Sequence, residues 1–195
     1  VYSEPDANAL HVDSVDVAVS LGGETPAQSY LRGDAIIAAA KATGADAIHP
    51  GYGFLAENAD FAREVESTGL IWVGPTPDQI TLLGDKVAAK RAALDANVPT
   101  TPIWEISDEQ IANGVAPDGV PMPALVKAAA GGGGRGMRIV TDAALLAESI
   151  TSASREAKAA FGAGAVFIEP YIERGRHIEV PIMGDQHGNV VHMGE

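Results

Sequence analysis

The chain has 195 residues, enough for one large domain or two small ones, and a globular composition with 46% hydrophobic and 20% charged residues. Its net charge of −13 argues against nucleic acid or an anionic membrane as the main partner. No apolar run approaches the roughly 20 residues of a membrane span, and without cysteine there is neither a disulfide nor a thiolate zinc site.

The first hundred residues alternate between predicted strands and helices. Strands are predicted at 15–19, 46–49 and 70–73. Helices are predicted over 30–43, from the cap residue Asn58 to Gly69, and over 77–96 with a break near Gly84. Because strand and helix alternate at crossover spacing, parallel βαβ units of an α/β fold are expected.

The second half differs in composition and order. Residues 97–123 are rich in proline, which is typical of a domain boundary. Strands are predicted at 124–128, 137–140, 166–169, 177–183 and 190–193. A long helix capped by Asp142 carries Leu146, Ile150, Ala153, Ala157 and Phe161 on one face. This order predicts an α+β arrangement, in which Pro181 requires strand 177–183 to be an edge or to be distorted.

Four consecutive glycines, Gly131 to Gly134, lie between two predicted strands, and Lys127 lies on the incoming one. Glycines let a loop fold over a ligand and direct several backbone N–H groups at it, and an ammonium beside them suits a nucleotide's phosphates. The stretch is neither a P-loop nor a dinucleotide fingerprint, because no Gly-Lys-Ser/Thr follows and the exit is a strand. A hairpin without a ligand is the alternative.

Other candidate binding residues are scattered along the chain. Lys86 falls in the first turn of a helix, where a cation opposes the macrodipole, which indicates another partner unless it is a plain surface lysine. Residues 169–172 end a strand, where exposed backbone can meet an adenine-like base. His177 and Glu179 would share a strand face and could contact a ribose or phosphate, or form a surface pair.

The loop at 49–58, HPGYGFLAEN, follows a predicted strand and precedes a helix. In open α/β sheets ligands bind at the carboxyl ends of strands, so its His, Tyr and Glu side chains suggest a site. The alternative is a tight βα turn in which Pro and Gly serve geometry alone. A metal site built from His177, Glu179, His187 and His192 matches no standard spacing.

Together these stretches resemble the biotin carboxylase family, the ATP-dependent component of acyl-CoA and pyruvate carboxylases. The matching stretches follow the family's order from about residue 25 to the end. They are HPGYGFLAEN at 49–58, GDKVA at 84–88, KAAAGGGGRGM at 127–137, EAKAAF at 156–161 and RHIE at 176–179. The chain departs from the family pattern at Ala130, Pro170 and Pro181, where relatives often carry glycine, lysine and glutamine.

The resemblance implies an ATP-grasp enzyme. The fold expected is the C-terminal part of a Rossmann-like biotin carboxylase N-terminal domain, followed by an ATP-grasp lid. Residues 1–84 would belong to the partial N-terminal domain, 85–123 to a helix and linker, and 124–195 to the lid with its glycine-rich hairpin, so the chain is expected to be a fragment.

Carried over by position, the resemblance also implies site residues. Lys86 and Lys127 would contact the ATP phosphates, and Leu125 and Met137 would be apolar walls for the base. The implied ATP-binding set is Lys86, Lys127, Gly131, Gly132, Gly133, Gly134, Met137, Glu169, Pro170, Tyr171, Ile172 and His177. The biotin and bicarbonate side of the cleft would be lined by His49, Tyr52, Gly53 and Glu57.

The implied activity is carboxylation of biotin with bicarbonate and ATP, with Mg²⁺ or Mn²⁺ as the metal. The family's catalytic base and metal ligands would lie after Glu195, so no catalytic or metal-binding residue is expected in the chain, which alone would be inactive. A biotin carboxyl carrier, a carboxyltransferase subunit and further copies of the enzyme are the implied partners, in the cytoplasm or a mitochondrial matrix.

Two alternatives remain open from the sequence. One is another ATP-grasp ligase, resembling carbamoyl-phosphate synthetase or a purine-pathway carboxylating enzyme, although these are not expected to carry the HPGYGF block. The other is a nucleotide-binding module without catalytic activity.

Overall fold

The computed structural model describes residues 1–129 and 137–195, without the side chain of Phe161. The predictions for Ala130 and for Gly131 to Gly134 lie outside these residues. The chain divides into two compact units, Val1–Thr100 and Thr101–Glu195, each described by itself below. The family domains with bounds at 84 and 123 stay a prediction.

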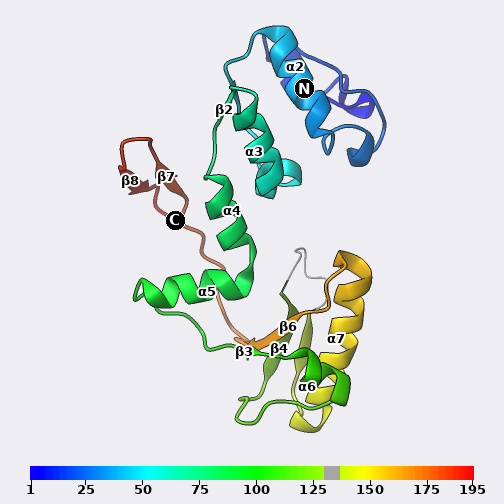
Figure 1. The fold of residues 1–195 in the computed structure, drawn as a ribbon, viewed down its shortest axis with the longest axis vertical. Helices are drawn as coiled ribbons and strands as arrows, with labels where there is room; N and C mark the ends of the chain where they lie inside the picture. The colour runs from blue at the N-terminus through cyan, green and yellow to red at the C-terminus, as the bar shows by residue number, and fades with distance from the viewer. Residues whose placement is uncertain (130–136) are drawn as a thin grey trace. The chain divides into compact units, whose positions relative to one another are not determined.

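The first unit alternates helices with short strands (Figure 1). Its β1 and β2 pair in parallel, with Ala47 opposite Ile71, and α3 connects them, which confirms the expected βαβ unit. The helices are α1 (Leu10–Asp13), α2 (Gly33–Thr43), α3 (Ala59–Ser67), α4 (Pro77–Gly84) and α5 (Lys86–Asp95), and the strands are β1 (Ala47–Ile48) and β2 (Ile71–Trp72). Short 3-10 turns occupy Glu4–Asp6, Pro26–Gln28 and Phe54–Glu57.

Local capping explains where these helices begin and end. The α2 helix stops at Gly44, which adopts a φ of 70° that favours glycine. The Asn58 side chain accepts a hydrogen bond from the backbone N–H of Phe61 at 2.8 Å and so starts α3. Asp85 separates α4 from α5 and accepts from the Val87 and Ala88 N–H groups. The predicted caps and the break near Gly84 are therefore confirmed.

The core of the first unit forms around α3. Phe61, Ala62 and Val65 are buried on one face of this helix and pack with Ile48 of β1 and Trp72 of β2. The rings of Phe61 and Trp72 meet edge to face, with centroids 5.7 Å apart. The helix therefore fixes the parallel strand pair from which the 49–57 loop emerges.

The strand predicted at 15–19 is wrong. These residues are irregular, and Val15 and Val17 are more than half exposed. The nearest pairing described is an isolated parallel bridge between Tyr2 and Ser20. Alternation of apolar residues specifies a strand through burial of one face, and here neither valine is buried.

The second unit contains an antiparallel sheet of strand order β3-β6-β4-β5. Figure 1 shows α7 lying along one face of this sheet, which confirms the expected α+β arrangement. The strands are β3 (Trp104–Glu105), β4 (Ala124–Ala128), β5 (Arg138–Val140), β6 (Val166–Pro170), β7 (Ile182–Gly184) and β8 (Val190–His192), and the helices are α6 (Asp108–Asn113) and α7 (Leu146–Phe161).

The core of this unit lies between α7 and the sheet. Leu146, Ile150 and Ala153 of α7 are buried against Ala124 and Val126 of β4, as the helical periodicity predicts. Asp142 caps a 3-10 turn (Ala143–Leu145) that leads into α7, by accepting from the Ala144 N–H at 2.9 Å. This packing assigns one face of β4 to the core and leaves alternate residues for the other face.

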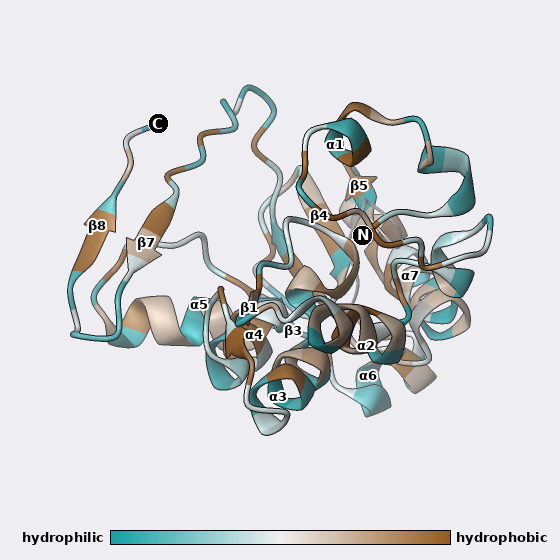
Figure 2. Ribbon diagram, turned by 90° about the horizontal axis from the view of Figure 1, so that it is seen from above, coloured by the Kyte–Doolittle hydropathy of each residue, from teal (hydrophilic) through white to brown (hydrophobic). Residues whose placement is uncertain are grey.

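β7 and β8 pair antiparallel, and both contain residues coloured hydrophobic in Figure 2. Their apolar residues Ile182, Met183, Val190 and Val191 are exposed. The strand predicted at 177–183 is shorter in the structure, because β7 starts only after Pro181. Proline has no N–H to donate, and its carbonyl accepts from the Met193 N–H at 2.9 Å at the end of the ladder. The strand therefore begins one residue after Pro181, at Ile182, and Pro181 is not part of it. Within the described ranges, no helix combines the length and apolarity needed to cross a membrane.

Candidate functional site

The side of the β4–β6 sheet opposite α7 carries the candidate nucleotide residues. Successive side chains of a strand point to opposite faces, so burial of Ala124, Val126 and Ala128 against the core directs Leu125 and Lys127 to the other side. The register places Leu125 opposite Glu169 and Lys127 opposite Phe167. Antiparallel pairing thus brings residues of two separate predicted motifs to one sheet face.

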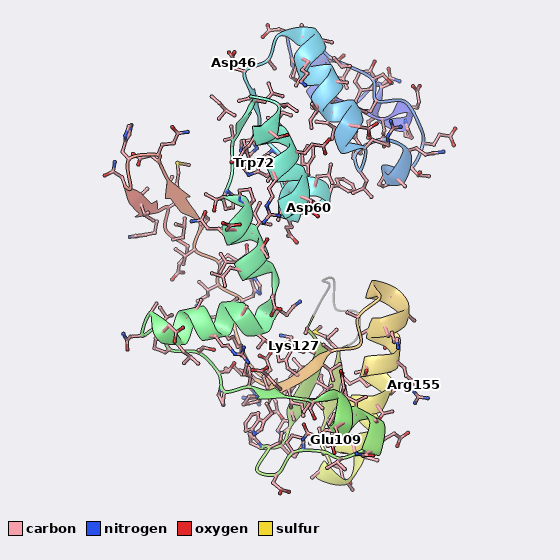
Figure 3. The ribbon with its side chains drawn as sticks, viewed as in Figure 1. Asp46, Asp60, Trp72, Glu109, Lys127 and Arg155 are labelled. Carbon is pink, nitrogen blue, oxygen red and sulfur yellow. The ribbon has the colours of Figure 1, made fainter. Side chains whose placement is uncertain are left out.

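Lys127 and Glu169 form an ion pair on this face (Figure 3 labels Lys127). The Nζ atom lies 2.7 Å from Glu169 Oε1, and the two side chains are 23% and 13% exposed. The same ammonium lies 5.8 Å from the centroid of the buried Phe167 ring. Such a pair combines a cation that can bind phosphate with a carboxylate that can accept a hydrogen bond from an amino group.

The predicted base-binding segment continues from the end of β6. Pro170 is the last residue of the strand and lies opposite Ala124. The Tyr171 N–H donates to the Pro123 carbonyl at 2.9 Å, which holds the backbone beyond the strand, and the Ile172 side chain is exposed. Met137 directly precedes β5 and is also exposed. The backbone at the end of β6 and the Met137 side chain are thus accessible to a planar base.

His177 and Glu179 are in contact, with Nε2 2.7 Å from Oε1, although both are exposed. They lie in the irregular stretch before β7, so strand alternation does not bring them together. The prediction that they share a strand face is therefore wrong, and of the two alternatives the structure shows the surface pair. Their contact with a nucleotide stays a prediction.

The 49–57 loop leaves the carboxyl end of β1 in the first unit. The Gly51 N–H donates to His49 Nδ1 at 3.0 Å, so in the neutral imidazole the proton is on Nε2. The Tyr52 side chain is 96% exposed, and Gly53 has a φ of 71°. Glu57 ends the following 3-10 turn and is exposed. The four residues predicted for the biotin and bicarbonate side therefore share one loop.

Lys86 is the first residue of α5, as predicted. Its neighbour Asp85 caps the helix, so a carboxylate accompanies the cation at this helix end. Among residues 1–129 and 137–195, no group of three or more His, Asp or Glu side chains is arranged to hold a metal ion.

Phe167 is the site residue that the sequence analysis did not single out. It lies opposite Lys127 in the ladder, and its ring supports the lysine side chain by a cation–π contact. Finding Phe167 requires the pairing register between strands 124–128 and 166–169, and predicting the two strands separately does not give that register.

Family models match the chain in two stretches. Residues 1–80 match the biotin carboxylase N-terminal domain, and residues 85–195 match the ATP binding domain of the carbamoyl-phosphate synthase L chain. The chain belongs to the biotin carboxylase family. The second model alone would suit a carbamoyl-phosphate-synthetase-like ligase as well. The match of residues 1–80 to the biotin carboxylase N-terminal domain decides against that alternative.

Whole-chain comparisons agree with this family assignment. The chain is 49% identical over 197 residues to the biotin-dependent acyl-coenzyme A carboxylase alpha3 subunit of Mycobacterium leprae, covering 100% of this chain and 33% of that relative. It resembles the biotin carboxylase of the Campylobacter jejuni β,γ-ATP complex with a TM-score of 0.89 and 41% identity, covering 98% of this chain and 43% of the other.

A further similar structure is the biotin carboxylase domain dimer of 2-oxoglutarate carboxylase from Hydrogenobacter thermophilus, in complex with MgADP, ADP and bicarbonate. Its TM-score is 0.84 at 41% identity, and the match covers 99% of this chain and 43% of that domain. The 195 residues thus span less than half the length of each of these three relatives.

Proposed function

We propose that the chain is the ATP-binding portion of a biotin carboxylase, which uses MgATP and bicarbonate to carboxylate biotin on a carrier protein. In this proposal residues 1–84 correspond to part of a Rossmann-like N-terminal domain and residues 124–195 to an ATP-grasp lid, with residues 85–123 leading into the lid. The family models and the nucleotide complexes of similar structures support the assignment.

The observation that carries the proposal is the Lys127–Glu169 pair on the sheet face opposite α7. Lys127 would bind an ATP phosphate, since an ammonium on a rigid strand makes charge-assisted hydrogen bonds to phosphate oxygens. Glu169 would accept a hydrogen bond from the adenine amino group, and the backbone of 170–172 would line the base. Leu125 and Met137 would supply apolar contact, and Lys86, His177 and the glycines at 131–134 would complete the ATP site.

The residues present fit the nucleotide better than the metal. Cation, acceptor and apolar side chains for ATP occur on one face of the sheet. Among the residues that the structure describes, no His, Asp or Glu cluster is arranged to hold Mg²⁺. When bound with ATP, the metal would neutralise developing phosphate charge.

The 49–57 loop would line the biotin and bicarbonate side of the site. His49 presents an imidazole whose Nδ1 already accepts from Gly51, and Tyr52 and Glu57 are exposed. These are groups that can contact a ureido ring or a small anion. Their position at the carboxyl end of a parallel strand supports the proposal.

The whole protein would work with a biotin carboxyl carrier, a carboxyltransferase subunit and a second copy of itself, in the cytoplasm or a mitochondrial matrix. These proposals rest on relatives that are components of biotin-dependent carboxylases. The 195 residues alone would bind nucleotide weakly and would not carboxylate biotin.

The test is ATP hydrolysis by the natural protein that contains this chain, with Mg²⁺, with and without bicarbonate and free biotin. We expect hydrolysis to require bicarbonate, to rise with biotin and to collapse in Lys127→Ala. The control is Lys158→Ala, which removes an exposed lysine of α7 in the same unit. Hydrolysis indifferent to both bicarbonate and biotin would refute the biotin carboxylase assignment.

A further inference from the structure

We propose that Tyr30, fixed through its hydroxyl, is a positioning residue that holds the 49–57 loop in place by stacking on Phe54. The loop's contact with biotin rests on the function proposed above, whereas the anchoring itself rests only on contacts within the first unit. Tyr30 lies outside the segments that the sequence analysis singled out for binding.

The stack joins Tyr30 to the centre of the loop. The two ring centroids lie 5.5 Å apart at an interplanar angle of 21°, which is a stacked arrangement. Phe54 follows Gly53 directly and adopts a φ of 45°, in the left-handed region that L-residues rarely occupy. A backbone of this kind persists only where its surroundings hold it, and the Tyr30 ring is the aromatic contact that Phe54 makes.

The far end of the Tyr30 ring is tied to the N-terminal turn. Its hydroxyl donates to Asp6 Oδ2 at 2.5 Å and accepts the Ser3 N–H at 3.0 Å. The Ser3 hydroxyl donates to the same carboxylate oxygen at 2.7 Å. These hydrogen bonds, from Ser3 and then Tyr30, lower the pKa of the Asp6 carboxyl because they stabilise its ionised form.

The backbone at Tyr30 is fixed as well. The preceding residue, Ser29, is fully buried, and its hydroxyl donates to the Thr25 carbonyl at 2.8 Å. The Leu31 N–H donates to the Pro26 carbonyl at 2.8 Å. The ring is therefore held at both ends before it meets Phe54, which makes it a rigid support.

The hydrogen bonds within the loop are local, from the Gly51 N–H to His49 Nδ1 and from the Ala56 N–H to the Gly53 carbonyl. Gly51 and Gly53 both adopt positive φ, and Phe54 is 57% exposed. Tyr30, His49 and Phe54 line a common apolar pocket of about 110 Å³, so the Tyr30 ring borders the same cavity as His49, one of the residues proposed for the biotin and bicarbonate side. Loss of the stack would release Gly53 and Tyr52.

The experiment is a double-mutant cycle in the natural protein, with Tyr30→Leu, Phe54→Leu and the double variant. We measure amide hydrogen exchange in peptides that cover 49–57. Each single variant is expected to speed exchange there by about tenfold, and the double variant no more than either, because one contact is removed in all three. Tyr30→Phe, which keeps the ring but loses the hydroxyl bonds, is expected to fall between wild type and Tyr30→Leu. Tyr2→Leu is the control, an aromatic residue of the same unit outside this stack.

Kinetics separate positioning from general stability. In Tyr30→Leu the KM for free biotin is expected to rise about fivefold or more, with the ATP dissociation constant unchanged, because only the loop is displaced. If Tyr30 had only a structural role, Tyr30→Leu would lower the unfolding temperature without raising the KM for biotin selectively over the ATP dissociation constant.

Two results would overturn the inference whatever the enzyme's activity proves to be: exchange in 49–57 no faster than in Tyr2→Leu, or additive effects in the double variant. Unchanged exchange in Tyr30→Phe would refute the hydroxyl anchor. Phe54→Leu replaces an exposed residue and so provides a result if Tyr30→Leu does not fold. Faster exchange with an unchanged KM for biotin would support anchoring of the loop by Tyr30. It would refute the proposal that the loop contacts biotin.

Discussion

The ammonium of Lys127 lies 2.7 Å from the carboxylate of Glu169, 42 residues further along the chain. The two residues are not direct partners in the ladder, because Lys127 faces Phe167 and Glu169 faces Leu125. The contact therefore runs diagonally across adjacent strands, within the reach of long side chains. A phosphate that binds Lys127, as proposed above, would share the ammonium with this carboxylate, so the pair would set both the charge and the selectivity of the site.

Replacing Lys127 by methionine tests the phosphate contact. The side chain stays flexible and apolar but loses the terminal ammonium, and with it the cation–π contact to Phe167. A charge-assisted hydrogen bond contributes about 1.5–3 kcal/mol. We expect the dissociation constant of ATP, measured by isothermal titration calorimetry, to rise at least about tenfold. Lys158→Met is the matched control and should bind ATP as the wild type does. Equal affinity in both variants would contradict the assignment of Lys127.

Replacing Glu169 by glutamine tests recognition of the base. The carboxylate only accepts hydrogen bonds, which suits an adenine amino group, whereas the glutamine amide also donates and can pair with the guanine carbonyl. We expect the preference for ADP over GDP, taken from their dissociation constants, to fall about tenfold in Glu169→Gln.

The control for this second change is Glu173→Gln, an exposed carboxylate just beyond the base-binding segment. It alters net charge by the same amount and should leave the ADP preference unchanged. If Glu169→Gln also retained the wild-type preference, Glu169 would not contact the base.

Features set by neighbouring residues could be predicted from the sequence, because their physics is local. Asn58, Asp85 and Gly44 each act within one turn of the helix that they start or stop. The Lys127–Glu169 and Tyr30–Phe54 contacts span 42 and 24 residues, so they depend on strand register and on packing that no local pattern encodes.

The failed strand predictions have distinct physical reasons. Residues 15–19 alternate but no face of them is buried, and Pro181 removes a ladder donor from 177–183. The sequence does not predict β3, which lies in the proline-rich stretch 97–123 that is typical of a domain boundary. Its pairing of Trp104 with Ile168 depends on a partner strand more than sixty residues away.

Truncating Ile150 to alanine tests the core between α7 and the sheet. This side chain is 1% exposed and packs in the cluster with Val126 and Val140. We expect the free energy of unfolding to fall by about 2–5 kcal/mol, the range for truncating a buried isoleucine to alanine. Urea denaturation measures it. Arg155→Ala, on the outward side of the same helix in Figure 3, should change the value by less than about 0.5 kcal/mol; similar losses in both variants would contradict the packing.

Acid titration tests the Arg32–Asp34 pair at the start of α2. Arg32 Nε donates to Asp34 Oδ1 at 2.8 Å and Arg32 Nη2 donates to Asp34 Oδ2. Hydrogen bonding from the Arg32 side chain is the main cause that lowers the pKa of Asp34 from 3.8 to about 2. Because the folded pKa lies below the unfolded one, the carboxylate's stabilisation is fully present above pH 3.8 and is lost as the pH falls toward about 2.

Asp34→Asn is therefore expected to lower the urea midpoint at pH 6, and its difference from wild type should shrink between about pH 4 and pH 2. In an Arg32→Gln background the same substitution should have little effect at any pH, since the donor that lowers the pKa is gone. A difference that persists unchanged to pH 2, or that survives in the Arg32→Gln background, would show that Asp34 stabilises α2 in some way other than through this pair.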